Sequence, residues 1–523
     1  MNDLRKEANN LEFLRGWRPY FIIFALGFLL YSQTLFFNFT YLDDNALILD
    51  NYPIISNLQN VGALFKNDVF FSPDKFYYRP ILNLSFMSDA AIAGSLPVIF
   101  HLTNILLHIL AAGLVFSLFS RWQPSRPLAF SFSLLFLVHP VLSQAVAWIP
   151  GRNDSLLAVF ILASFLSFLT FTDQPRLRSY IAYLFFLFLA LLTKETAIFF
   201  PLMIFFYFLV LEPRKVLVSD RWLIVAGSVL VGFFWFLMRH FALGGETTQA
   251  NAALEQIIHN SPAFLVYLGK LLFPFNLSVF PILADSRLIY GLFALPLFIL
   301  AWVFSRTKRN KYIIFSLFWF FLFLAPSFIR INGLPDFLEH RLYLSFIGFL
   351  LFLAEIDWIK DLDFKRKNVK IITAALLIFL ALLAWRHSAD FRNRLVFWQA
   401  AASSSPHSPL VEKNLGTMYY LDGNFSEAEI YYQNALALNA QEAMVHNNLG
   451  VIYLAQGDYR QAEQEFRNEL SLNPRYDKAL FNLGDLFYRE KKYSEAAQFW
   501  LETLRVNPLY QEAYDRLTLL KKL

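Results

Sequence analysis

The sequence predicts an all-α protein in which a polytopic membrane domain precedes an α-solenoid of helical repeats. Of the 523 residues, 57% are hydrophobic and only 16% are charged, which is too apolar for an ordinary soluble protein. Apolar windows long enough to cross a bilayer recur along residues 1–385, and they predict the membrane domain. A repeat of 34 residues after Trp385 predicts the solenoid.

About eleven membrane crossings are expected. The apolar windows lie at 20–37, 96–119, 128–147, 155–171, 180–193, 196–211, 222–238, 288–305, 312–329, 342–356 and 370–385. No small-residue cleavage site follows the first window, so we expect an uncleaved anchor and not a signal peptide. Residues 262–282 contain Lys270, Pro274 and Pro281, so we expect a re-entrant or interfacial segment there and not a twelfth crossing.

Positively charged residues predict the orientation of these helices. Lys and Arg gather before the first window and in alternate connections: Arg5, Lys6, Arg15 and Arg18; Arg121 and Arg126; Arg176 and Arg178; Arg214, Lys215 and Arg221; 306–311; and 360–370. We therefore expect a cytoplasmic N-terminus and, after an odd number of spans, a repeat domain on the opposite side. Since this pattern explains the basic net charge of +5, we expect no nucleic-acid partner.

The chain after residue 385 is read as a linker at 386–408 and a repeat domain at 409–523. "NLG" recurs at 414–416, 448–450 and 482–484, and Ala428, Ala462 and Ala496 recur in phase. This pattern resembles the tetratricopeptide repeat, in which small residues lie where paired helices touch. We expect three units plus a capping helix, and a binding surface for a protein partner rather than a catalytic domain.

One polar position of each repeat is a candidate for peptide binding. Asn414, Asn448 and Asn482 recur on the first helix of each unit, which lines the concave face in this fold. A ladder of carboxamides can hydrogen-bond an extended peptide whatever its side chains. The alternative is that Asn is simply common at this repeat position.

Two adjacent aspartates, Asp43 and Asp44, follow the first apolar window at the start of the longest outer loop, residues 38–95. Such a pair can act as a general base and its partner, or ligate a divalent cation. The alternative is a solvated turn, since "LDDN" is also good turn and helix-cap chemistry. Other polar residues favour the functional interpretation.

Most of these residues map to the same outer face as the aspartates. They are Arg79 in the long loop; His101, Asn104 and His108 on one face of the helix in 96–119; His139 and Arg152 near a helix end; Lys194 and Glu195 between two spans; and His340, Arg341 and Tyr343 at another rim. Ionisable groups at a membrane edge are costly, so we expect them to line a polar outer cavity. Interhelical hydrogen bonds and snorkelling are the alternatives for any single residue.

The order of these motifs resembles a known family. The acidic pair is followed by "YRP", "FHLTNILLH", "HPVLSQAVAWIPGRND", "TKET" and "EHRLYLSFIGF", with the repeats behind the last span. The whole chain thus resembles the transmembrane and tetratricopeptide repeat-containing O-mannosyltransferases and their bacterial relatives, which are integral-membrane glycosyltransferases of the GT-C class. The resemblance implies a GT-C-like fold and transfer of a sugar, mannose or another hexose, from a polyprenyl phosphate to an acceptor hydroxyl.

The resemblance also implies roles for particular residues. Asp43 is expected to be the catalytic base with Asp44 as its partner, although their roles are interchangeable at this level. Arg341 is the first choice for the lipid phosphate, since a guanidinium offers paired donors and keeps its charge. Arg79, Lys194 and Arg152 are second choices, and His101, His108 and His139 are expected to orient the sugar or phosphate. Where relatives commonly carry an acidic residue after "HPV", this chain has Gln144.

The expected partners are a polyprenyl-phosphate-linked sugar, membrane lipid and a protein or glycan acceptor. No cofactor is certain, and a divalent metal, Mg or Mn, at Asp43 and Asp44 stays open. The absence of Cys and of an N-terminal targeting extension favours a bacterial cytoplasmic membrane over the endoplasmic reticulum, and we expect the repeats to be periplasmic or extracellular. Two other classes stay open: a transporter, and a non-catalytic envelope assembly scaffold that would have no use for Asp43.

Overall fold

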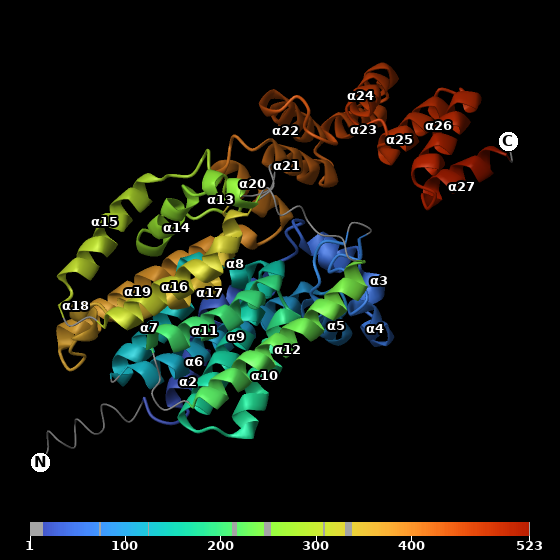
Figure 1. Cartoon of the computed structure of the whole chain (residues 1–523). Helices are drawn as coiled ribbons and strands as arrows, with labels where there is room; N and C mark the ends of the chain where they lie inside the picture. Colours follow the sequence, from blue (N-terminus) through green and yellow to red (C-terminus); the bar gives the residue numbers. More distant parts are fainter. Residues whose placement is uncertain are drawn as a thin grey trace, which may run out of the picture. The chain divides into compact units, whose positions relative to one another are not determined.

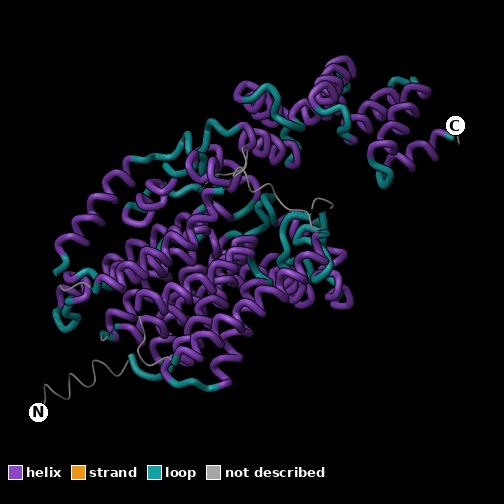
Figure 2. The backbone as a smooth tube through the Cα atoms, viewed as in Figure 1, coloured by secondary structure: helices purple, strands orange, loops and turns teal. Residues whose placement is uncertain are grey.

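The structure is a computed structural model that describes residues 14–72, 75–123, 125–211, 217–244, 253–306, 309–329 and 337–521. Its described residues form helices and no strands (Figures 1 and 2), which confirms the all-α prediction. Two compact units divide the chain, Met1–Phe397 and Trp398–Leu523. The basic residues Arg5, Lys6, Arg214 and Lys215 lie outside the described residues.

The first unit is a bundle of apolar helices joined by short irregular segments. Its α-helices are α2 (Arg18–Tyr31), α3 (Tyr52–Ile55), α4 (Val61–Leu64), α5 (Pro80–Ala93), α6 (Pro97–Trp122), α7 (Arg126–Val138), α8 (Gln144–Ala147), α9 (Arg152–Asp173), α10 (Leu177–Leu191), α11 (Phe200–Leu211), α12 (Val218–Leu243), α13 (Ala253–His259), α14 (Ala263–Leu272), α15 (Ile289–Phe304), α16 (Asn310–Leu324), α17 (Leu342–Leu353), α18 (Asp357–Lys360) and α19 (Lys367–Ser388). Helix α20 (Arg394–Ser404) follows at the boundary between the units.

Every predicted apolar window falls on a helix. Six helical segments are long and apolar enough to cross a membrane, or seven if the pair Arg126–Val138 and Pro140–Ala147, bent by 51°, is one span. The four windows at 180–193, 196–211, 288–305 and 342–356 fall on shorter apolar helices. Helix α14 has only ten residues, fewer than one helix needs to span a bilayer, and the re-entrant or interfacial character of 262–282 stays a prediction. These helices make the chain an integral membrane protein.

The many phenylalanines serve two purposes. Inside the bundle, Phe165 packs edge-on against Trp319 and Trp122, with ring centroids 5.2 and 5.5 Å apart. On the outside, large apolar side chains stay exposed along α12 and α15, among them Phe241 and Phe304. An exposed apolar surface of this kind is expected where lipid replaces water as the solvent.

Glycine allows helices α14 and α15 to touch. A Cβ atom on Gly291 would lie 2.0 Å from the backbone oxygen of Leu265, and one on Gly269 would lie 2.8 Å from the amide nitrogen of Gly291. The two backbones therefore pack without any side chain between them, as small residues permit in membrane helices. This contact joins the short α14 to a longer neighbour.

The long outer loop is folded and has a small core of its own. Its irregular helix η2 (Asn45–Leu49) and helices α3 to α5 enclose Leu47, Ile48 and Phe86, which pack with Phe100 of α6. The acidic pair lies at the start of this structure, between η1 (Ser32–Phe36) and η2. Asp43 and Asp44 thus belong to an ordered segment.

The second unit is a stack of helix pairs. They are α21 (Pro409–Leu421) with α22 (Phe425–Leu438), α23 (Val445–Gln456) with α24 (Tyr459–Leu472), and α25 (Asp477–Arg489) with α26 (Tyr493–Val506), followed by α27 (Gln511–Leu520). In each pair the "NLG" glycine faces an aromatic ring: Gly416 faces Tyr432, Gly450 faces Phe466 and Gly484 faces Trp500, and an added Cβ would come within 2.4–2.9 Å of the ring. The predicted tetratricopeptide pattern is thereby explained physically. The segment 386–408, predicted as a linker, carries the end of α19 and helix α20.

Candidate active site

The structure gives the two aspartates different environments. Asp43 is exposed, whereas Asp44 is buried. Asp44 Oδ2 accepts hydrogen bonds from the Thr40 amide at 2.6 Å and the Thr40 hydroxyl at 3.1 Å, and its Oδ1 accepts from the Leu42 amide at 3.1 Å. Asp44 therefore shapes the acidic loop (residues 38–44), and Asp43 is the carboxylate that solvent can reach.

Burial changes the acidity of the Asp44 carboxyl group. Desolvation raises the pKa of Asp44 from 3.8 to about 6, against the opposing effect of the hydrogen bonds from Thr40. Both of its oxygens accept hydrogen bonds from the loop backbone or from Thr40, so this carboxyl group is held within the loop. Among the residues that the structure describes, no three His, Asp or Glu side chains cluster in a way that would hold a metal ion.

A small cationic pocket lies between α9, the α10–α11 connection and the start of α17. Its polar lining includes Asp154, Lys194, Ser327 and Arg341. Lys194 Nζ donates to both oxygens of Asp154, at 2.7 and 2.8 Å. With two cations against one carboxylate, the pocket favours an anion.

Burial and neighbouring charges change the pKa of Lys194. Burial lowers the pKa of Lys194 to about 8, against the opposing effect of Asp154, and the nearby positive charges of Arg341 and Arg79 lower it further. An anion in the pocket would raise the pKa of Lys194 and stabilise its charged form. The Nε atom of Arg341 is buried and has no hydrogen-bond partner among the described residues, so the guanidinium retains a donor for a ligand.

Arg79 and Glu195 form a pair that joins two parts of this face. Arg79 donates to Glu195 Oε2 at 3.0 Å, and the Tyr78 amide donates to Glu195 Oε1 at 3.0 Å. The guanidinium also lies over the ring of Tyr77, with its carbon 4.3 Å from the ring centroid. The pair thus connects the long outer loop with the segment that carries Lys194.

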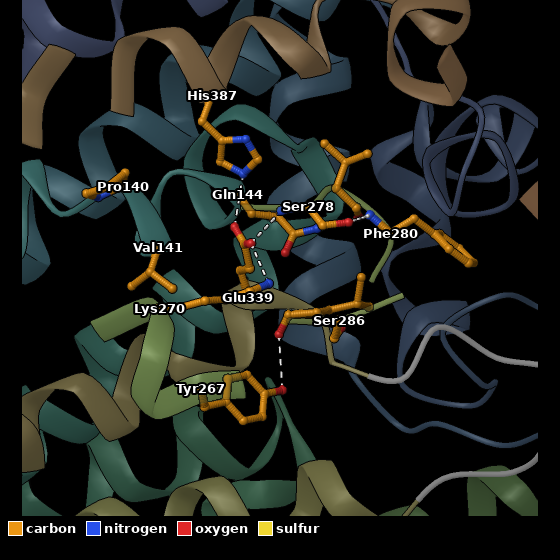
Figure 3. Close-up of polar contacts among 12 residues, drawn as sticks. Pro140, Val141, Gln144, Tyr267, Lys270, Ser278, Phe280, Ser286, Glu339 and His387 are labelled. Atoms are coloured by element: carbon orange, nitrogen blue, oxygen red, sulfur yellow. Dashed lines mark hydrogen bonds and ion pairs between the residues drawn. The ribbon is translucent and has the colours of Figure 1, made fainter. Parts of the chain in front are cut away.

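The short helix η9 (Glu339–Arg341), which carries Arg341, is anchored by a buried carboxylate (Figure 3). Glu339 Oε1 accepts from Lys270 Nζ and from the Ser278 amide, both at 2.7 Å, and Oε2 lies 2.9 Å from His387 Nε2. His387 Nδ1 lies 2.9 Å from Asp390. Residues from three distant segments therefore hold η9 in place.

Gln144 supplies a second anchor for η9. Its Oε1 accepts from the His340 amide at 3.1 Å, and its Nε2 donates to the carbonyl oxygen of Val279 at 3.2 Å. A carboxamide can donate and accept at once, whereas a carboxylate cannot donate. Gln144 is therefore a bridge between loops. His340 itself lies 3.8 Å from Asp154 and packs on the ring of Trp148.

Several side chains expected to contact substrate are used instead for helix packing. Arg152 is fully buried and binds Asp89 at 2.5 Å, the Asn104 side-chain oxygen at 2.8 Å and the Phe100 carbonyl at 2.7 Å. Asn104 donates to the carbonyls of Val146, Trp148 and Ile149. Because their polar atoms are satisfied inside the protein, the geometry gives Arg152 and Asn104 a structural role and corrects the expected substrate contacts.

The histidines of this region are buried in the same way. His108 lies 2.6 Å from the Tyr343 hydroxyl and 3.0 Å from the Leu137 carbonyl, which accounts for both of its ring nitrogens and for Tyr343. His139 lies 3.1 Å from the Leu271 carbonyl. His101 is 1% exposed and packs edge-on against Phe37, and neither of its ring nitrogens has a hydrogen-bond partner among the described residues. His108 and His139 thus make the interhelical contacts that were the alternative for them, whereas a substrate role for His101 stays a prediction.

Two of the three repeat asparagines, Asn448 and Asn482, form hydrogen bonds with Asn447. Asn482 Nδ2 donates to Asn447 Oδ1 at 2.8 Å, and Asn447 Nδ2 donates to Asn448 Oδ1 at 3.3 Å. Asn414, Asn448 and Asn482 are all half-buried. A peptide role for these side chains therefore stays a prediction.

Sequence reasoning missed some of the residues that organise the site. Asp154, the partner of Lys194, was visible as a charge near a helix end, and Lys270 as a charge in an apolar segment. His387 lies in the stretch expected to be a linker, and the sequence gives no signal that it approaches Glu339, 48 residues away.

Comparisons with known proteins agree with the order of the motifs. Residues 89–238 match the family described as dolichyl-phosphate-mannose-protein mannosyltransferase. Residues 413–515 match the middle tetratricopeptide-like domain of cilia and flagella-associated protein 70. The first match covers helix α9, which carries Arg152 and Asp154, and the α10–α11 connection, which carries Lys194, and the second covers the helical repeats.

The similar curated proteins share one name. Protein O-mannosyl-transferase Tmtc1 of Drosophila melanogaster is 35% identical over 179 residues, which cover 33% of this chain and 21% of that protein. A protein O-mannosyl-transferase of Caenorhabditis elegans is 25% identical over 439 residues, 79% of this chain and 62% of that protein. The chain thus covers less than two thirds of either relative. The matches confirm that this chain resembles the transmembrane and tetratricopeptide repeat-containing O-mannosyltransferases.

Proposed function

We propose that this protein is a GT-C glycosyltransferase that moves a sugar, mannose or another hexose, from a polyprenyl phosphate to an acceptor hydroxyl. The observation that carries the proposal is the pocket in which Arg341 and Lys194 meet beside a single carboxylate. A lipid phosphate needs such a cationic site at the rim of a membrane helix bundle. The names of the similar proteins support a protein acceptor.

The proposed reaction needs few groups. Asp43 takes the proton of the acceptor hydroxyl while the hydroxyl oxygen attacks the anomeric carbon. The bond between that carbon and the phosphate oxygen breaks, and the phosphate keeps the electron pair. The configuration at the anomeric carbon is inverted. Arg341 and Lys194 stabilise the charge that develops on the phosphate. Asp44 contributes by fixing the loop, through its hydrogen bonds to Thr40 and Leu42.

The remaining assignments follow from this reaction. The repeat unit would recruit a protein acceptor or partner and raise its concentration near the site. The site and the repeats would face away from the cytoplasm. The basic connections between the helices are expected on the cytoplasmic side, and the acidic loop and the repeats are expected on the other side. A polyprenyl phosphate reaches such a site through the bilayer, so no nucleotide sugar is needed there.

Sugar transfer by the purified protein tests the proposal. A panel of polyprenyl-phosphate sugars would be incubated with cell-envelope extract and with wild type, Asp43→Asn or Asp50→Asn. Asp50 is a matched control, because it is an exposed carboxylate in the same loop. We expect transfer to be lost only with Asp43→Asn, and the labelled product to identify the acceptor. Equal transfer by all three proteins would contradict the catalytic role of Asp43 and favour a scaffold or transporter.

A further inference from the structure

The end of α19 and the residues after it make contacts on two sides. This connector (residues 385–394) comprises the last turn of α19, η10 (Ala389–Phe391) and the first residue of α20, and it directly precedes the repeat unit in the sequence. The carbonyl of Trp385 accepts from Gln33 Nε2 at 2.7 Å. Phe391 is fully buried, so the connector is anchored in the first unit.

On one side the connector holds the acidic loop. The amide of Asn38 donates to the carbonyl of Arg392 at 2.8 Å. The guanidinium of Arg394 lies over the ring of Tyr41, with its carbon 5.2 Å from the ring centroid. Tyr41 has a φ of 59°, an unusual conformation for a residue with a large side chain.

The position of Tyr41 makes this contact important. Tyr41 stands between Thr40 and Leu42, whose amides both donate to Asp44. The strained backbone at Tyr41 turns these two amides toward one carboxylate, and strain of this kind persists only where neighbours impose it. Arg394 is one such neighbour, and Asp43 follows directly in the chain.

On the other side the connector holds the arginine loop, η9 (Glu339–Arg341). His387 Nε2 lies 2.9 Å from Glu339 Oε2 (Figure 3). Its Nδ1 lies 2.9 Å from Asp390 of the connector itself. Both ring nitrogens face carboxylate oxygens, so the ring is fixed in orientation. Glu339 is two residues from Arg341, which lines the cationic pocket.

We propose that the connector positions both halves of the active site, with Arg394 setting the acidic loop and His387 setting the arginine loop. This role rests on the proposed function, because it concerns the residues that would take the proton and hold the phosphate. Arg394 and His387 are positioning residues. A displacement of about 1 Å at either loop is enough to slow a reaction that depends on alignment.

Hydrogen exchange tests the first contact without any need for catalysis. In Arg394→Gln we expect the amides of residues 40–44 to exchange at least about tenfold faster than in wild type, because the hold on Tyr41 is lost. Arg394→Lys, which keeps a cation for the ring, should restore most of the protection. Arg386→Gln is the matched control, since Arg386 is an exposed arginine at the other end of the connector, in the last turn of α19. Equal exchange in Arg394→Gln and Arg386→Gln would overturn this part of the proposal.

Kinetics with the lipid-linked sugar test the second contact. In His387→Ala we expect the KM for the donor to rise roughly tenfold with a smaller change in kcat, because the phosphate ligand Arg341 moves. His387→Gln should restore the KM, since its amide can donate to Glu339. A fall in kcat at unchanged KM, with no rescue by Gln, would show a merely structural role and overturn the assignment. If wild type transfers no sugar, the proposed function fails, while the exchange experiment still tests the connector.

Discussion

Asp44 is a buried carboxyl next to an exposed one, and its titration affects the stability of the protein. The carboxyl has its ordinary pKa of 3.8 when unfolded and a pKa of about 6 when folded, so the folded state keeps a proton that the unfolded state loses. Its contribution to stability is therefore complete below pH 4 and is lost as the pH rises through 6, by about 1.4 kcal/mol per pH unit in this window.

Thermal unfolding in detergent should detect this titration. Between pH 4.5 and 7 we expect the Tm of wild type to fall relative to that of Asp44→Asn, which cannot titrate. Asp50→Asn, at an exposed position, should track wild type across the same range. Parallel Tm curves for wild type and Asp44→Asn would contradict the burial of an ionisable group at this position.

Arg341 is the residue on which donor binding is expected to depend most. In Arg341→Gln we expect kcat/KM for the lipid-linked sugar to fall roughly a hundredfold, because a charged donor to the phosphate is lost. Arg341→Lys should recover only part of the activity, since an ammonium cannot form paired hydrogen bonds. Steady-state kinetics would measure both, with Arg178→Gln, an exposed arginine elsewhere, as control. Full activity in Arg341→Gln would place the phosphate elsewhere.

At the scale of single elements, helix α14 depends on glycine for its contact with α15. In Gly291→Ala the new Cβ would meet the Leu265 carbonyl, so we expect the helices to separate at a cost of about 1–3 kcal/mol. Gly232→Ala in α12 meets no atom within 4 Å and should change stability by less than about 1 kcal/mol. A lower Tm for Gly291→Ala alone would confirm the close contact. Equal Tm values for the two variants would refute it.

The elements were predictable because hydropathy and repeat spacing act locally. Every apolar window became a helix, and each repeat glycine met its aromatic partner. The pairing of polar side chains was not predictable in the same way. Lys194 and Asp154 are 40 residues apart, and His108 and Tyr343 are 235 apart, so only the folded bundle brings them together.

Because only the fold brings polar side chains together, the sequence could not separate residues that line a cavity from residues that bond to a neighbouring helix. A polar stripe on an apolar helix has the same pattern whether it lines a cavity or bonds to a neighbouring helix, and His108 and Asn104 do the latter. The two aspartates were also indistinguishable by sequence, since the burial of Asp44 depends on the backbone around Tyr41.

For the whole molecule, the absence of Cys allows a direct test of topology. Single cysteines at Ser56, Gln174 and Ser471, all exposed, would be labelled with a membrane-impermeant maleimide in intact cells or vesicles. We expect Ser56→Cys and Ser471→Cys to react from one side and Gln174→Cys only after the membrane is permeabilised, because the basic connection at 174 should face the cytoplasm. Labelling of Gln174→Cys from the same side as Ser56→Cys would refute the proposed orientation.

The two contacts of the connector also limit how such a protein can be recombined. An engineered exchange of repeat arrays that joins the chains at residue 385, where the last apolar window ends, would replace His387 and Arg394 together with the repeats. A junction at Trp398 would keep both residues with Glu339 and Tyr41, the residues of the first unit that they contact. The portable module of this protein therefore begins about a dozen residues later than its hydropathy suggests, and a chimera cut at the earlier position would carry foreign residues against the acidic loop and η9.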